Sequence, residues 1–209
     1  MDHQGLVAVL VVVGYLLGAI PFGIVVSKAM GLPDPRTVGS KNVGFTNVLR
    51  VSGTKAGVLT LLGDMGKGWV LGWVAMQWLT VESFIMIVAL SPILGHLFSP
   101  FLGFKGGKGV ATAVGAVLGL SPSIGLLLLL IWLGTVAIWR YSSGGALAAF
   151  GCFPVVAIVL LILEDTFVSD LGNLHLAGIV TLYLSLVLGY VSGGHYVWSF
   201  WKQVVAKGL

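Results

Sequence analysis

Apolar stretches close to the length of a bilayer span recur along this chain, and the short connections between them carry nearly all of its charge. Hydrophobic residues make up 57% of the sequence and charged residues only 9%, which leaves little polar surface for a water-soluble fold. A helix needs about 20 apolar residues to cross the hydrocarbon core, and it satisfies its own backbone hydrogen bonds there. The pattern therefore predicts an all-α, polytopic integral membrane protein that forms a single domain over residues 1–209.

The sign of the charge alternates from one connection to the next. The acidic set is Asp2, Glu82, Glu164, Asp165 and Asp170, and the basic set is Arg36, Lys41, Arg50, Lys55, Lys105, Lys108, Arg140, Lys202 and Lys207. Because basic connections stay preferentially in the cytoplasm, we expect about seven crossings, with the N-terminus outside and the C-terminus inside. The expected spans are 6–28, 56–80, 83–104, 109–120, 123–139, 145–163 and 174–192.

Two of these spans are imperfect. The fourth is short and ends at Ser121-Pro122, and we expect the run from Gly63 to Gly68, GDMGKG, to break the second. Within that run Asp64 and Lys67 lie three residues apart, so on a helix they share a face and can neutralise one another. Two interpretations remain open: a buried ion pair that fixes helix register, or a contribution of Lys67 to an anion site.

The run GHLFSPFLGFKGGKGVAT, from Gly95 to Thr112, places two lysines among glycines beside apolar sequence. Glycines let successive N–H groups converge on one point, through positive φ or close approach, and Lys105 and Lys108 add positive charge. The run predicts a cradle for an anion such as phosphate at the membrane surface, in which Gly106 and Gly107 act through the backbone. A basic juxtamembrane loop is the alternative.

The run GSKNVGFTNVLR, from Gly39 to Arg50, concentrates polar side chains in an otherwise apolar chain. Its amides and hydroxyls can orient a polyol, and the planar guanidinium of Arg50 suits a phosphate. The alternative is an ordinary loop in which Thr46 or Asn47 caps the following helix.

Two histidines, His96 and His195, lie at the expected cytoplasmic ends of spans, near a further polar run that contains Ser142 and Ser143. A general base is needed for transfer chemistry, and it could be either histidine or an oxygen of a substrate phosphate. No histidine has a second metal-type ligand at i+3 or i+4, and the lysine–glycine run lacks the spacing of a P-loop. We therefore expect no metal, no cofactor and no nucleic-acid partner. No serine or cysteine has a convincing base, which argues against a covalent intermediate on the protein.

These motifs resemble those of the bacterial acyl-phosphate:glycerol-3-phosphate acyltransferases, the PlsY family. GSKNVGFTNVLR resembles GSGNxGATNxxR, DMGKG resembles DxxKG, and GHLFSPFLGFKGGKGVAT resembles the family's second long motif. The resemblance implies transfer of a fatty acyl group from acyl phosphate to the 1-hydroxyl of sn-glycerol 3-phosphate, giving lysophosphatidic acid and phosphate. It further implies a bacterial inner membrane location, a cytoplasmic active site, membrane lipids around the protein and an acyl-phosphate-forming enzyme as partner.

Matched position by position, the resemblance implies that the catalytic residues are His195, His96 and Lys108. It implies that the residues binding substrate and phosphate are Ser40, Asn42, Thr46, Asn47, Arg50, Lys67, Lys105, Gly106, Gly107, Thr112, Ser142 and Ser143.

The chain also departs from the family pattern. Lys41 and Phe45 stand where the family has glycine and alanine, and Trp198 stands at the position of an asparagine. The tail after His195 has no asparagine, arginine or glutamate. Two other functions therefore stay open: a transporter or flippase for a phosphorylated or lipid-phosphate solute, and a non-catalytic paralogue.

Overall fold

A computed structural model of the protein describes residues 3–139, and every described element is a helix. In chain order these are α1 (His3–Ala19), α2 (Phe22–Ala29), α3 (Phe45–Ser52), α4 (Thr54–Trp78), α5 (Glu82–Leu97), the short 3₁₀ helix η1 (Pro100–Leu102), α6 (Val110–Leu120) and α7 (Pro122–Trp139). The expected spans 145–163 and 174–192 lie outside the described residues. The chain divides into two compact units, Met1–Leu126 and Leu127–Leu209, and the site described below belongs to the first.

The expected first span, 6–28, consists of two helices and not of one continuous helix. α1 and α2 meet at Pro21 with a bend of 46° between their axes. Proline has no N–H to donate and its ring clashes with the preceding turn. Pro21 therefore ends α1, although the sequence on both sides of it is apolar. The bend leaves backbone carbonyls without helical partners in the interior of the bundle.

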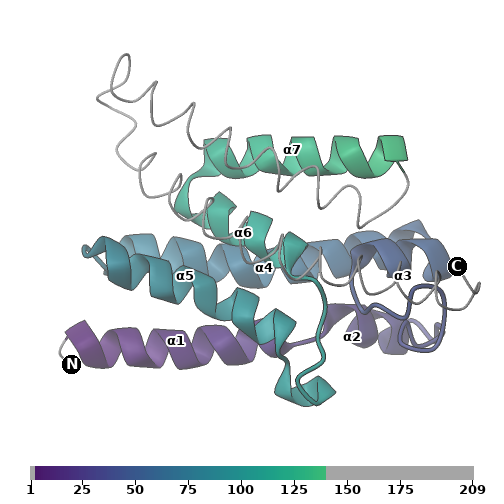
Figure 1. The fold of residues 1–209 in the computed structure, drawn as a ribbon, viewed down its shortest axis with the longest axis horizontal. Helices are drawn as coiled ribbons and strands as arrows, with labels where there is room; N and C mark the ends of the chain where they lie inside the picture. The colour runs from purple at the N-terminus through teal and green to yellow at the C-terminus, as the bar shows by residue number, and fades with distance from the viewer. Residues whose placement is uncertain (1–2, 140–209) are drawn as a thin grey trace, which may run out of the picture. The chain divides into compact units, whose positions relative to one another are not determined.

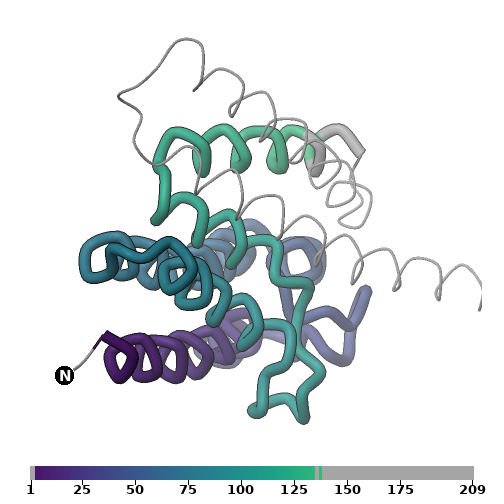
Figure 2. The backbone as a smooth tube through the Cα atoms, turned by 60° about the vertical axis from the view of Figure 1, so that its left-hand side comes forward, coloured from purple at the N-terminus to yellow at the C-terminus, as the bar shows by residue number. Residues whose placement is uncertain are grey.

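The expected break in the second span is also wrong, because α4 runs without interruption from Thr54 to Trp78. Gly68 and Gly72 of this helix serve packing. A Cβ on Gly68 would lie 2.0 Å from the Thr112 carbonyl oxygen, and one on Gly72 would lie 2.4 Å from that of Ala116. Small residues four apart let two helix backbones approach closely in a membrane, and α4 and α6 lie side by side in this way (Figures 1 and 2).

Glycines also allow α1 and α5 to pack closely. A Cβ on Gly18 would lie 2.1 Å from the Pro92 carbonyl oxygen, and one on Gly95 would lie 2.0 Å from that of Tyr15. Both contacts meet backbone and not flexible side chains, so the crossing has no room for a larger residue. Figure 1 shows α1 and α5 running alongside each other, which brings the end of α5 close to the bend between α1 and α2.

The outer faces of the described helices are apolar. Val12 on α1 is 58% exposed, Leu62 on α4 is 57% exposed and Trp78 on α4 is 56% exposed, and large apolar side chains at the surface are typical of helices that face lipid. By length and hydropathy, within residues 3–139 the segment Glu82–Leu102 is able to cross a bilayer, and the bent α1–α2 pair makes a second candidate. α6 is short, as expected for the fourth span.

Candidate functional site

A buried polar cluster lies where α4, α5 and the α1–α2 bend meet. Nζ of Lys67 is 2.9 Å from Oδ1 of Asp64, 2.9 Å from Nδ1 of His96 and 2.9 Å from the carbonyl oxygen of Ile20. Asp64 is 1% exposed, Lys67 3% and His96 6%. The ion pair expected from the three-residue spacing is confirmed, and His96, from another helix, joins it.

The N–H donors of Lys67 face groups inside the protein. Nζ donates to the carbonyl of Ile20, contacts Nδ1 of His96 and forms an ion pair with Asp64. Of the two interpretations of Lys67, this geometry favours the buried ion pair over a direct contact with an anion. Lys67 also satisfies one of the carbonyls freed at the bend, and the hydroxyl of Ser99 donates to the other, that of Ala19, at 2.7 Å.

The glycine loop, residues 103–109, is fastened to the end of α5. The N–H of Gly106 donates to the carbonyl of Leu97 at 2.9 Å, and the N–H of Gly107 donates to that of His96 at 3.1 Å. A Cβ on Gly106 would lie 1.9 Å from the His96 carbonyl oxygen, and one on Gly107 would lie 2.1 Å from Nε2 of His96. These two glycines are therefore required for close approach to His96.

The expectation that Gly106 and Gly107 offer their amides to an anion is wrong for these two groups, because the end of α5 already accepts both hydrogen bonds. Neither glycine has a positive φ. The left-handed residues of the loop are Gly103 at 60°, Phe104 at 62° and Gly109 at 77°. The loop thus changes direction at its two ends, and Gly106 and Gly107 at its centre lie close to His96.

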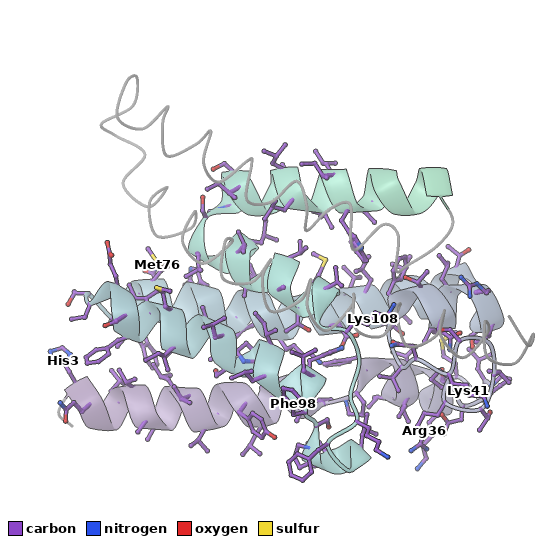
Figure 3. All side chains as sticks on the ribbon, in the orientation of Figure 1. His3, Arg36, Lys41, Met76, Phe98 and Lys108 are labelled. Atoms are coloured by element: carbon purple, nitrogen blue, oxygen red, sulfur yellow. The ribbon has the colours of Figure 1, made fainter. Side chains whose placement is uncertain are left out.

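Lys108 follows this contact and precedes α6 (Figure 3). It is half-buried, and no carboxylate among residues 3–139 forms an ion pair with it. Burial disfavours the charged ammonium and lowers the pKa of Lys108 below its usual value. Gly109 caps α6 in the left-handed conformation without a side-chain hydrogen bond, so the amides of the first helical turn lack a side-chain acceptor. A cation beside such amides favours an anion.

Two neighbouring predicted residues differ in exposure. Lys105 is exposed, whereas Thr112 is completely buried in α6, and its hydroxyl has no hydrogen-bond partner in the described part of the chain. Lys105 can therefore reach a ligand by moving its side chain. Thr112 contributes to the packing of α6 against α4.

The polar run before α3 is held together by a single side chain. Nδ2 of Asn47 donates to the carbonyls of Pro35, Val38 and Asn42 at 2.9, 3.2 and 2.9 Å, and Oδ1 accepts the N–H of Ser40 at 2.8 Å. With 3% of its surface exposed, Asn47 shapes the loop from inside. Helix capping by Thr46 or Asn47 is wrong, because α3 begins after Gly44 with no side-chain cap.

Other members of this run keep their side chains at the surface. Ser40 and Arg50 are exposed, and Thr46 is half-buried. Asn42 is half-buried and its Oδ1 accepts the N–H of Gly44 at 2.8 Å, which tightens the turn into α3. Arg50 lies in the last turn of α3, so its guanidinium is available to a phosphate.

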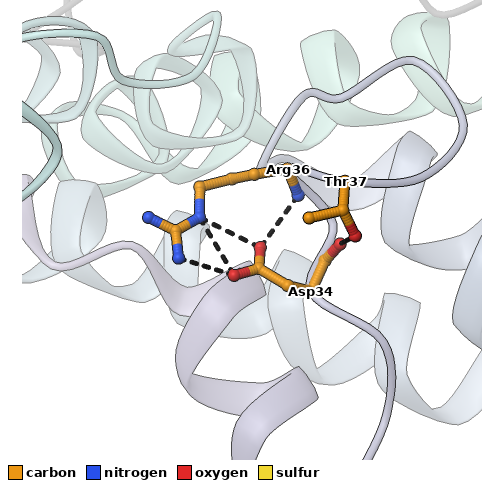
Figure 4. Close-up of polar contacts among 3 residues, drawn as sticks. All are labelled: Asp34, Arg36 and Thr37. Atoms are coloured by element: carbon orange, nitrogen blue, oxygen red, sulfur yellow. Dashed lines mark hydrogen bonds and ion pairs between the residues drawn. The ribbon is translucent and has the colours of Figure 1, made fainter.

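Asp34 and Arg36 form an ion pair in the loop before α3 (Figure 4). Nε of Arg36 donates to both carboxylate oxygens at 3.0 and 3.1 Å, and the hydroxyl of Thr37 donates to the Asp34 carbonyl at 2.9 Å. Hydrogen bonds from the Arg36 side chain and backbone lower the pKa of Asp34. The pair is at the surface and shapes a turn, with no buried polar group attached to it.

The described site residues thus fall into two groups: one on the loop before α3, and the other on the cluster and glycine loop. His195, Ser142 and Ser143 lie outside the described residues. Sequence reasoning missed the contacts of Ile20 and Ser99, for which Pro21 inside an apolar run was the available signal. Residues 3–139 hold no cluster of three histidine, cysteine or acidic side chains placed to bind a metal ion.

Within residues 3–139, an all-helical fold with apolar outer faces is typical of a helical membrane protein. The model of the glycerol-3-phosphate acyltransferase family matches residues 8–200, so the chain belongs to that family, as its motifs indicated. A glycerol-3-phosphate acyltransferase of Methylobacillus flagellatus is 52% identical over 154 residues, which cover 74% of this chain and 79% of the relative. One of Methylococcus capsulatus is 41% identical over 181 residues, covering 87% and 86%.

The fold is also similar to that of a solved relative. The structure of PlsY (YgiH), an integral membrane glycerol 3-phosphate acyltransferase, in its glycerol 3-phosphate form superposes with a TM-score of 0.73 at 34% identity. The match covers 96% of this chain and 92% of that one. Its lysophosphatidic acid form gives a TM-score of 0.71 at 32% identity, with the same coverage.

Proposed function

We propose that this protein transfers a fatty acyl group from acyl phosphate to the 1-hydroxyl of sn-glycerol 3-phosphate, giving lysophosphatidic acid and phosphate in phospholipid synthesis. The observation that carries the proposal is Lys108, a half-buried cation without an ion-pair partner in residues 3–139, set between the glycine loop and the start of α6. Solved relatives in glycerol 3-phosphate and lysophosphatidic acid forms support this acceptor and this product.

The reaction needs little from the protein beyond positioning and charge. The acceptor hydroxyl oxygen forms a bond to the acyl carbon, the bond from that carbon to the phosphate oxygen breaks, and inorganic phosphate leaves with the electron pair. The hydroxyl proton passes to a base, for which His195, His96 and a substrate phosphate oxygen are the candidates. Holding two anions in line and stabilising the developing negative charge supply most of the rate.

The described residues divide this work. Lys108, Lys105 and Arg50 bind phosphate groups, while Ser40 and Thr46 orient the glycerol moiety. The other proposed site residues support these contacts or complete the site; they are Asn42, Asn47, Lys67, Gly106, Gly107, Thr112, Ser142 and Ser143. Because Lys108 is cationic only below its lowered pKa, phosphate binding weakens as the pH rises through that value.

The orientation in the membrane is part of the proposal. About seven crossings place the N-terminus outside, the C-terminus inside and the site on the cytoplasmic face of the bacterial inner membrane. There it meets membrane lipids and an acyl-phosphate-forming enzyme that supplies the donor. Reporter fusions after Lys55, Gly109 and Leu209 should signal cytoplasm, and a fusion after Asp170 should signal the outside. A cytoplasmic signal at Asp170 would overturn the orientation.

The function is tested with purified protein in detergent, labelled glycerol 3-phosphate and long-chain acyl phosphate. We expect labelled lysophosphatidate and stoichiometric phosphate, and no product when acyl-CoA replaces acyl phosphate. The same preparation in liposomes should not accumulate glycerol 3-phosphate. Uptake without acylation would identify a transporter, and neither activity in a folded preparation would identify a non-catalytic paralogue.

A further inference from the structure

The two ring nitrogens of His96 face different surroundings. Nδ1 lies 2.9 Å from Nζ of Lys67, whereas Nε2 lies against Gly107. We propose that His96 is neutral, carries its proton on Nε2, and donates that N–H to a phosphate oxygen of a bound substrate. This proposal rests on the proposed function and assigns His96 a role different from that of a general base.

The hydrogen-bond partners of Lys67 determine the tautomer. Its ammonium group can only donate, so Nδ1 of His96 must accept, and the ring proton of a neutral imidazole is then on Nε2. Nζ also donates to the Ile20 carbonyl at 2.9 Å and forms an ion pair with Oδ1 of Asp64 at 2.9 Å. These two contacts hold Nζ beside Nδ1.

The alternative assignment is a proton on Nδ1 shared with Asp64. Nδ1 is 3.4 Å from Oδ1 of Asp64, a longer and weaker contact than the 2.9 Å contact with Lys67. The proton on Nδ1 would also leave one Lys67 N–H facing another donor. The geometry therefore favours the proton on Nε2.

The position of Nε2 suits a substrate contact. This nitrogen is 2.1 Å from the place that a Cβ of Gly107 would occupy, so it lies on the glycine loop one residue before Lys108. Within residues 3–139 no protein acceptor takes its hydrogen bond, and His96 keeps 6% of its surface exposed. An anion held by Lys108 would give this N–H its acceptor.

Within the described residues, no third charged side chain contacts the imidazole ring of His96. Asp64 and Lys67, both on α4, are the charged residues in contact with His96. α6 has no titratable side chain, and on α1 the hydroxyl of Tyr15 is engaged with the Phe98 carbonyl at 2.6 Å. His96 is thus a fixed donor, which leaves proton removal to His195 or to a substrate phosphate oxygen.

The tautomer can be measured without activity, by ¹⁵N NMR of protein labelled at histidine in detergent. The signal that disappears in His96→Gln belongs to His96. We expect a proton on Nε2 and none on Nδ1, and a shift of the Nε2 signal on adding inorganic phosphate. Separate additions of glycerol 3-phosphate and acyl phosphate show which substrate supplies the oxygen. A proton on Nδ1, a doubly protonated ring, or no response to any of the three would overturn the proposal.

Kinetics supply a second test, because glutamine places an N–H near the position of Nε2. We expect His96→Ala to lose about a hundredfold in kcat/KM, the usual effect of removing one such donor, and His96→Gln to recover most of it. The pH profile of His96→Gln should keep the acidic limb of the wild type. Equal losses in both variants, or loss of that limb, would indicate a base and contradict the proposal.

The matched control is Ile87→Ala, on the same helix and 50% exposed, which should keep wild-type kinetics. The two proposals fail separately. An inactive wild type with the proton on Nε2 and a phosphate response contradicts acyl transfer alone. An active wild type with the proton on Nδ1 contradicts only the role of His96.

Discussion

The two polar loops of this protein are built in opposite ways. The loop before α3 is rich in polar side chains, and the side chain of Asn47, in the first turn of α3, holds the backbone of this loop through hydrogen bonds. The glycine loop has few side chains, and backbone contacts with the end of α5 hold it. A dense polar run therefore need not be a dense binding site. The sparser loop leaves a larger share of its charged groups, Lys105 and Lys108, free of ion pairs within the described residues.

The largest expected effect on activity comes from adding a side chain where the glycine loop contacts α5. Gly106→Ala would place a methyl group 1.9 Å from the His96 carbonyl oxygen, which cannot move without displacing the helix end. We expect kcat/KM to fall by about a hundredfold or more, since displacements near 1 Å have that effect. The control is Gly66→Ala, whose Cβ meets nothing within 4 Å. Near-normal activity of Gly106→Ala would show that the loop is only a linker.

The loop before α3 should respond differently, through stability. Asn47→Ala removes a side chain that makes hydrogen bonds to four backbone groups, and we expect the free energy of unfolding to drop by about 2–4 kcal/mol. Thermal denaturation in detergent measures this. Asn42→Ala is the matched control, because the Asn42 side chain accepts a hydrogen bond from the N–H of Gly44, and its loss should lower the stability less. An unchanged melting temperature in Asn47→Ala would remove the distinction between the loops.

A smaller effect is expected at Lys105. Its side chain is exposed, so an ionic contact with substrate is screened by water, and Lys105→Ala should lower kcat/KM by roughly two- to fivefold. The assay is acyl transfer at constant salt, repeated at high salt, where the difference from wild type should shrink. A loss that persists at high salt would mean that Lys105 turns inward when substrate binds.

The smallest effect is expected at the surface pair of Asp34 and Arg36. Arg36 lowers the pKa of Asp34, so the pair stabilises the fold above the ordinary aspartate pKa, and that stabilisation is lost as the pH falls through the lowered value. Because the pair is exposed, Arg36→Gln should leave the melting temperature and activity at neutral pH unchanged. A clear loss of activity would make Arg36 part of the site.

Sequence reasoning predicted local features well and remote contacts poorly. The all-helical class, within residues 3–139, and the Asp64–Lys67 pair follow from hydropathy and a three-residue spacing, and both are confirmed. The predicted positions of the helix breaks are wrong, because Gly63 and Gly68 in GDMGKG permit close packing within an unbroken helix, whereas Pro21 ends a helix inside an apolar run. The meeting of His96 with Lys67 depends on how α4 crosses α5, which neither local spacing nor hydropathy specifies.

The central claim, that the cation at the glycine loop serves acyl transfer, is tested most directly by the pH dependence of kcat/KM for Lys108→Met beside wild type. The acceptor is labelled glycerol 3-phosphate and the donor is acyl phosphate. Burial lowers the pKa of Lys108, so wild-type activity should fall as the pH rises through that lowered value. We expect Lys108→Met to be about ten- to a hundredfold slower, to lack that alkaline limb and to melt no earlier than wild type. A variant with the wild-type rate and the same alkaline limb would contradict the account.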